Sequence, residues 1–198
     1  MQIDRENLIQ QLLNVFQTIP EVHHVALRGS ILSGNTDRFS DIDLLIDGAS
    51  ITTETLATLI LQHMDRHFEI EFFDWATSLM PNEYVVTFYL KNTSIFWNID
   101  VQLISSSRQQ PSCEFMNQRI HHLLKLWILN LKYLQRKQYD KLTIKKLASK
   151  LAIPDDTLSD SEMMRKIFET IQNESDRKLN VFLLACEKEL EQYEKQLV

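Results

Sequence analysis

Apolar residues recur at helical spacing through the first part of the chain. They are Ile3, Leu8, Ile9, Leu12, Leu13, Phe16 and Ile19, and Pro20 follows them. Because residues three and four positions apart share one face of a helix, this pattern predicts an amphipathic helix that ends before the proline.

Short apolar and β-branched runs come next, separated by turn residues, and they predict strands. The runs cover residues 22–27, 41–46, 68–73, 84–90 and 94–104. The last two runs are expected to form a hairpin that turns around residues 91–93. After the second run, Thr52 or Thr53 can cap a helix that carries Leu56 and Ile60 on its apolar face. The first half of the chain is therefore predicted to be mixed α/β.

The second half has the periodicity of helices. Long helical patterns cover residues 115–138 and 176–197, and shorter ones cover residues 144–151 and 161–171. Between the halves, the stretch 105–112 is rich in serine, contains Pro111 and has little apolar content, which is typical of a linker. We therefore predict an α+β fold in which a mixed-sheet domain, residues 1–108, precedes a helical bundle domain, residues 113–198.

The composition is that of an ordinary globular protein of 198 residues, with 44% hydrophobic and 24% charged residues. No apolar run approaches the roughly 18 residues that a membrane span needs, and the first residues are too polar for a secretion signal. Cys113 and Cys186 are isolated from each other and lack the spacing of metal ligands. These features predict a cytoplasmic protein that does not contact a membrane.

The charge is unevenly distributed along the chain. The net charge of −6 argues against a protein whose main role is to bind nucleic acid. Residues 117–150 nevertheless contain a single acid, Asp140, and nine basic residues: Arg119, Lys125, Lys132, Arg136, Lys137, Lys141, Lys145, Lys146 and Lys150. This run has two interpretations, a solvated helix face or a wall that faces phosphate groups.

Two carboxylates stand close together in the second predicted strand. Side chains alternate along a strand, so Asp41 and Asp43 are expected on one face and Ile42 and Leu44 on the other. Like charges at that distance repel each other unless a cation lies between them. Oxygen-only ligands suit a hard divalent ion, Mg²⁺ first. The alternative is a strand-initiating cap beside a surface acid.

A glycine and a serine, Gly29 and Ser30, directly follow the first predicted strand. A glycine at this place permits a tight turn with close approach of the backbone, and the serine hydroxyl and nearby amides can hold a phosphate. A Gly-Ser pair by itself is more often a plain turn. Together with the two aspartates it indicates a phosphate site that faces a metal site.

These residues resemble a motif of the DNA polymerase β-like nucleotidyltransferase superfamily. The motif is a strand that ends in Gly-Ser, a spacer of about ten residues, and Asp-x-Asp in the next strand; here Gly29-Ser30, residues 31–40 and Asp41-Ile42-Asp43 match it. The details at Gly34 and at residues 40–44 are also similar, and the resemblance covers mainly residues 22–104. It implies a catalytic domain at residues 1–108 that uses two Mg²⁺ ions and a nucleoside triphosphate, for which we expect ATP.

The same resemblance implies a third acid on a later strand, and Asp100 is the preferred candidate. It lies on the polar side of an alternating pattern that also contains Asn98 and Gln102. It would hold the second metal ion or take a proton from the acceptor hydroxyl. Three other acids stay open as alternatives: Glu69, Glu71 and Asp74.

The predicted site therefore has two groups of residues. The catalytic and metal-binding residues are Asp41, Asp43 and Asp100, and the nucleotide-binding residues are Gly29, Ser30, Arg38 and Ser40. In this hypothesis Ser30 contacts the β- or γ-phosphate, and Arg38 or a lysine of the basic run assists.

The layout is similar to that of small antibiotic nucleotidyltransferases, which act on aminoglycosides or lincosamides. Residues 1–112 contain fourteen acids and six basic residues, and such a surface would attract a polycationic sugar. We therefore expect a small-molecule hydroxyl acceptor, bound between the two halves, and no nucleic-acid partner. The alternatives are an antitoxin-like enzyme that modifies a protein and a regulator that uses residues 142–158 as part of a helix-turn-helix. A homodimer is also considered.

Overall fold

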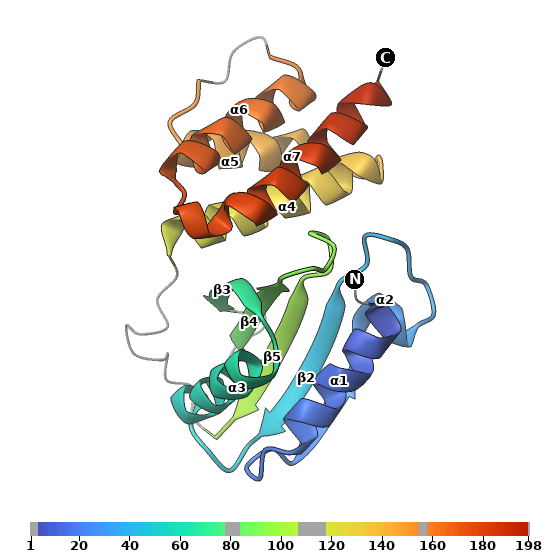
Figure 1. Ribbon diagram of the computed structural model, residues 1–198, viewed down its shortest axis with the longest axis vertical. Helices are drawn as coiled ribbons and strands as arrows, with labels where there is room; N and C mark the ends of the chain where they lie inside the picture. The colour runs from blue at the N-terminus through green and yellow to red at the C-terminus, as the bar shows by residue number, and fades with distance from the viewer. Residues whose placement is uncertain (1–3, 78–83, 107–117, 155–157, 198) are drawn as a thin grey trace. The chain divides into compact units, whose positions relative to one another are not determined.

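The computed structural model describes residues 4–77, 84–106, 118–154 and 158–197. Its contacts divide the chain into two compact units, residues 1–117 and 118–198 (Figure 1). The predicted boundary between residues 108 and 113 lies outside the described residues.

In its described residues, the first unit has a five-stranded mixed sheet and three helices. Along the chain its elements are α1 (Arg5–Gln17), β1 (His24–Leu27), α2 (Gly29–Leu32), β2 (Ile42–Gly48), α3 (Thr53–His67), β3 (Ile70–Thr77), β4 (Tyr84–Leu90) and β5 (Ile99–Ser105). The strand order is β1-β2-β5-β4-β3. The central pair β2 and β5 is parallel, and every other neighbouring pair is antiparallel. The predicted α+β class with a mixed sheet is confirmed.

Helices α1 and α3 begin at capping residues and cover one face of the sheet (Figure 1). Asp4 caps α1 by accepting from the amide of Asn7, and Thr52 caps α3 by accepting from the amide of Thr55. The strand residues beneath them are buried: Ile42, Leu44 and Ile46 of β2, and Ile99, Val101 and Leu103 of β5. Because side chains alternate, Asp43 and Asp100 lie on the other face of the sheet.

The structure corrects the prediction of a strand over residues 94–104. β5 begins only at Ile99, because a turn precedes it in which the amide of Trp97 donates to the carbonyl of Ser94. Ile95, Phe96 and Asn98 are all buried, so the predicted alternation does not hold before the strand. The sequence analysis also missed α2, a single helical turn that follows Gly29.

The second unit consists of helices, as predicted. They are α4 (Arg119–Gln135), α5 (Lys141–Lys150), α6 (Asp160–Glu174), the 3₁₀ turn η2 (Arg177–Leu179) and α7 (Asn180–Lys195). A capping box formed by Ser159 and Glu162 begins α6. The buried side chains include Trp127, whose indole nitrogen donates to the carbonyl of Met164, and Cys186. In the described part of the chain, no helix combines the length and the apolar character that crossing a membrane requires.

Candidate active site

Three carboxylates gather where β2 and β5 begin. The two strands run parallel, and their register places Asp43 directly opposite Asp100. Asp41 stands two residues before Asp43, immediately before β2. Oxygen atoms of the three side chains lie within 4.8 Å of one another, and each side chain is half-buried. The structure thus brings together the three acids that the sequence analysis selected.

This arrangement is electrostatically costly without a cation. The pKa of Asp43 is raised above its ordinary value, first because the carboxyl is partly buried and then because Asp100 repels its negative charge. Arg28 acts in the opposite direction and lowers this pKa. Three clustered carboxylates are a donor set that suits a hard divalent ion such as Mg²⁺. The residues present therefore fit a divalent metal ion of the kind that the resemblance implies.

Two buried neighbours hold the carboxylate of Asp100. The hydroxyl of Thr87, opposite Asp100 on β4, donates to Oδ1. The side-chain amide of Asn98 donates to Oδ2 at 3.1 Å. Neither neighbour was selected from the sequence: the contact of Thr87 depends on how β4 and β5 are paired, and that of Asn98 on the path of the chain just before β5.

Gly29 lies against Asp43. Its φ angle of +65° is in the left-handed region, and a Cβ atom at this position would lie 2.1 Å from Oδ2 of Asp43. Only glycine fits here, both because of its backbone conformation and because of this close approach. In addition, the amide of Arg28 donates to the carbonyl of Asp43 at 2.8 Å. The turn after β1 is therefore fixed directly on the strand that carries the carboxylates.

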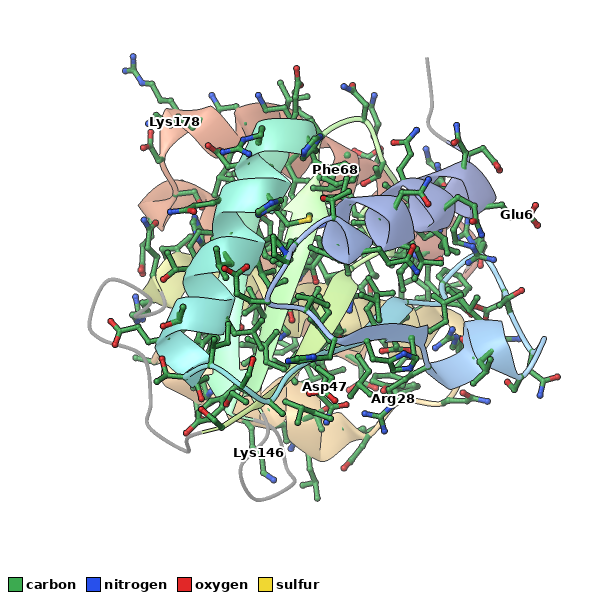
Figure 2. The ribbon with its side chains drawn as sticks, turned by 90° about the horizontal axis from the view of Figure 1, so that it is seen from below. Glu6, Arg28, Asp47, Phe68, Lys146 and Lys178 are labelled. Carbon is green, nitrogen blue, oxygen red and sulfur yellow. The ribbon has the colours of Figure 1, made fainter. Side chains whose placement is uncertain are left out.

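A cavity of about 320 Å³ opens at this place. It is lined by Arg28, Gly29, Asp43, Leu44, Val85, Asp100 and Gln102. Figure 2 shows the Arg28 side chain leaving the chain where β1 gives way to α2. Arg28 is a candidate functional residue that the sequence analysis missed, although its position directly before Gly29 was a usable signal. The cavity combines two carboxylates, one guanidinium and a glycine turn.

The other predicted nucleotide-binding residues do not line this cavity. Ser30 is half-buried in α2, beside Gly29. Ser40 is buried, and its hydroxyl both accepts from the amide of Asp37 and donates to Asp37 Oδ1, which holds the loop before Asp41. The guanidinium of Arg38 lies 4.5 Å from the ring centre of Phe39. Nucleotide binding by Ser30, Arg38 and Ser40 stays a prediction.

The alternative third acids lie elsewhere in the sheet. Asp74 is on β3, opposite Thr87 of β4, so β4 separates it from the strand of Asp100. Glu71 is on the same strand, and Glu69 lies just before it. Among the described residues, the group with metal-ligand geometry consists of Asp41, Asp43 and Asp100.

The chain was compared with known protein families, curated proteins and solved structures. The sequence model of a nucleotidyltransferase domain matches residues 9–168. A search of curated proteins found no match. Similar solved structures include the GLD-2/RNP-8 complex, with 15% identity and a TM-score of 0.39 over 91% of this chain and 72% of that chain. They also include the polymerase core of TRAMP, an RNA surveillance complex, with 16% identity and a TM-score of 0.38 over 93% of this chain and 58% of that chain.

The family match spans most of the chain and includes the Gly-Ser turn and all three carboxylates. The chain therefore belongs to the nucleotidyltransferase domain family and is a transferase.

Proposed function

We propose that this protein transfers a nucleoside monophosphate, from ATP and with Mg²⁺, to a hydroxyl group of a small-molecule acceptor. The observation that carries the proposal is the cluster of Asp41, Asp43 and Asp100, with Gly29 and Arg28 beside it. Family membership supplies the reaction class, and the cluster suggests where the reaction takes place.

Each residue has a role in this proposal. Asp41 and Asp43 would hold Mg²⁺, and Asp100 would either hold the second ion or accept the proton of the acceptor hydroxyl. When bound, the ions supply positive charge to the triphosphate and to the leaving pyrophosphate. Gly29 lets the phosphates approach the backbone, and the guanidinium of Arg28 neutralises a phosphate oxygen. Ser30, Arg38 and Ser40 are further candidates for nucleotide contacts.

The reaction exchanges one phosphorus–oxygen bond for another. The acceptor oxygen attacks the α-phosphorus, the bond to the β-phosphate oxygen breaks, and pyrophosphate leaves. The hydroxyl proton passes to Asp100 or to solvent. Because Asp43 and Asp100 lie on paired strands and Arg28 lies at a tight turn bonded to Asp43, the chain would orient the reacting groups before they meet.

The charge of the protein favours a small, cationic acceptor over a nucleic acid. The net charge is −6, and acids outnumber basic residues fourteen to six in residues 1–112. A polyanion would be repelled from such a surface, whereas an aminoglycoside- or lincosamide-like amine would be attracted. A helix-turn-helix role is also disfavoured, because α6, which follows α5, opens with Asp160 and Glu162.

The nucleotide site is tested by thermal-shift titration with ATP, GTP, CTP and UTP, with and without Mg²⁺. We expect Mg²⁺-dependent stabilisation of the wild type that is lost in Asp41→Asn/Asp43→Asn. Asp47→Asn is a matched control, because Asp47 lies at the other end of β2, outside the acid cluster. A wild type that no nucleotide stabilises, or equal losses in both variants, would contradict the proposed site.

The acceptor class is tested by two measurements, the release of pyrophosphate and the transfer of label from α-³²P-labelled ATP to the acceptor. We expect release that requires an aminoglycoside or a lincosamide, with the label recovered on that compound. Label on a protein would instead establish the antitoxin-like alternative, and label on an RNA oligonucleotide would establish a tailing enzyme. The homodimer stays a prediction, which light scattering of the purified protein would test.

A further inference from the structure

Both oxygen atoms of the Asp100 carboxylate accept a hydrogen bond, and the two donors come from different segments of the chain. Thr87, in the middle of β4, donates its hydroxyl hydrogen to Oδ1, and Asn98, just before β5, donates from its side-chain amide to Oδ2. Both residues are 0% exposed. Their donors are therefore fixed by packing on all sides, while Asp100 itself is half-buried and lines the cavity.

Two donors on two oxygens fix the orientation of a carboxylate. An aspartate side chain otherwise rotates about χ1 and, in a broad minimum, about χ2. Each ionised oxygen can accept more than one interaction, so one hydrogen bond per oxygen leaves capacity for a cation. Outer hydrogen bonds of this kind set the direction in which a carboxylate presents its remaining lone pairs to a metal.

Asn98 has a second effect, on the strands themselves. Its backbone carbonyl accepts from the amide of Ile42 at 2.9 Å. Ile42 lies between Asp41 and Asp43, so the residue that orients Asp100 also joins β5 to the segment that carries the other two acids. The relative position of the three carboxylates depends on this connection.

If Thr87 and Asn98 served packing alone, they would not both need to donate to Asp100. Polar side chains are costly to bury, and an apolar residue of similar shape would satisfy packing at position 87 without that cost. In this structure both buried polar groups point to the same half-buried carboxylate. This convergence is the observation from which the inference is drawn.

We infer that Thr87 and Asn98 are positioning residues that aim Asp100 at the metal ion and the acceptor hydroxyl, an inference that rests on the proposed function. They act through Asp100 and do not themselves contact the substrate. Losing either donor therefore weakens metal binding without removing a metal ligand.

The test measures Mn²⁺ affinity of the full chain by electron paramagnetic resonance, together with the rate of pyrophosphate release. Thr87→Val keeps the shape and removes the donor; Thr87→Ser keeps the donor. We expect Thr87→Val to bind Mn²⁺ about 10-fold more weakly, as is typical when an outer-shell partner is lost, and Thr87→Ser to stay close to the wild type. Asn98→Ala is a second variant, for which a similar loss is expected.

Thr53→Val is the matched control. Thr53 is also 0% exposed, and its hydroxyl is 2.6 Å from the hydroxyl of Ser105, at the far end of β5. At the usual rise per strand residue, this contact lies about 16 Å along the strand from Asp100. We expect Thr53→Val to lower stability as Thr87→Val does, but to leave Mn²⁺ affinity unchanged.

The outcomes separate this inference from the proposed function. If the wild type binds Mn²⁺ and Thr87→Val and Asn98→Ala bind it equally well, the positioning role is refuted and the proposed function stands. The role is also refuted if Thr53→Val weakens binding as much as Thr87→Val, or if Thr87→Ser fails to restore it. If the wild type itself does not bind Mn²⁺, the proposed function and the inference fall together.

Discussion

The contact between Gly29 and Asp43 shows how strongly single residues constrain this site. Gly29 combines a left-handed backbone with a position where any side chain would overlap Asp43 Oδ2. Gly34 is also left-handed, with φ +72°, but nothing lies within 4 Å of the place where its Cβ would be. The two glycines therefore separate the effect of backbone strain from the effect of the overlap.

Gly29→Ala is expected to lose Mg²⁺-dependent thermal stabilisation and to destabilise the fold by at least about 1 kcal/mol. Gly34→Ala carries similar backbone strain and should keep the Mg²⁺ response. Differential scanning fluorimetry with and without Mg²⁺ measures both effects. An unchanged Mg²⁺ response in Gly29→Ala would show that the close approach is not required for metal binding.

Asp43→Asn is expected to stabilise the metal-free protein while it destroys the metal site. The amide has nearly the same shape, but it removes a partly buried charge that Asp100 repels. Because solvent reaches part of the group, the gain should be only about 1 kcal/mol. Urea denaturation in EDTA should show this gain, and added Mg²⁺ should stabilise the wild type alone. A less stable variant in EDTA would mean that Arg28 more than offsets the repulsion.

The sequence was sufficient to select Asp41, Asp43 and Asp100, because a motif and an alternating pattern mark them. It was not sufficient for Thr87, whose contact with Asp100 depends on the register between β4 and β5, or for Asn98, whose contact depends on the backbone path just before β5. Nor did it indicate that Ser40 holds Asp37, a contact within a loop whose path no periodicity describes.

At the scale of elements, local signals predicted the helices better than the strand ends. Helical periodicity and caps are local, so the second unit agreed with expectation. The start of β5 was misplaced because residues 95–97 are apolar for a different reason: Phe96 packs edge-on against Phe39 in the loop before β2, with 4.9 Å between ring centres. In a sequence, apolar residues that pack inside a loop look the same as apolar residues of a buried strand.

Helices α6 and α7 are joined by an ion pair that should give a measurable pH dependence. Arg165 donates to both oxygens of Glu194, and this lowers the pKa of Glu194. The stabilisation is therefore present above the ordinary glutamate value and is lost as the pH falls through the lowered pKa. Both side chains are about a third exposed, so the contribution should be only about 0.5 kcal/mol.

Glu194→Gln should accordingly lower the free energy of unfolding at neutral pH and have little effect in acid, where the wild-type carboxyl is protonated. Urea denaturation at the two pH values measures the difference. Glu191→Gln, at an exposed acid on the same helix, is the control. A loss that is equal at both pH values would indicate that packing of Glu194, rather than its charge, stabilises α7.

At the scale of the whole molecule, the charge distribution should influence acceptor binding. If a polycationic acceptor is drawn to the acidic first unit, raising the salt from about 0.01 M to about 0.1 M shortens the Debye length from about 30 to about 10 Å and weakens the attraction. The KM for an aminoglycoside should then rise several-fold, and the KM for a neutral acceptor should change little. Salt-independent values for both would remove the electrostatic argument for a cationic acceptor.

The parallel pairing of β2 with β5 determines when the site can exist. Asp43 and Asp100 are neighbours in the sheet, but α3, β3 and β4 lie between them in the sequence. A chain emerging from the ribosome therefore has no complete acid cluster until β5 has been synthesised and has inserted between β2 and β4. Since the unfolded chain lacks the cluster, metal binding stabilises the native state alone. Cellular Mg²⁺ would therefore favour completion of folding.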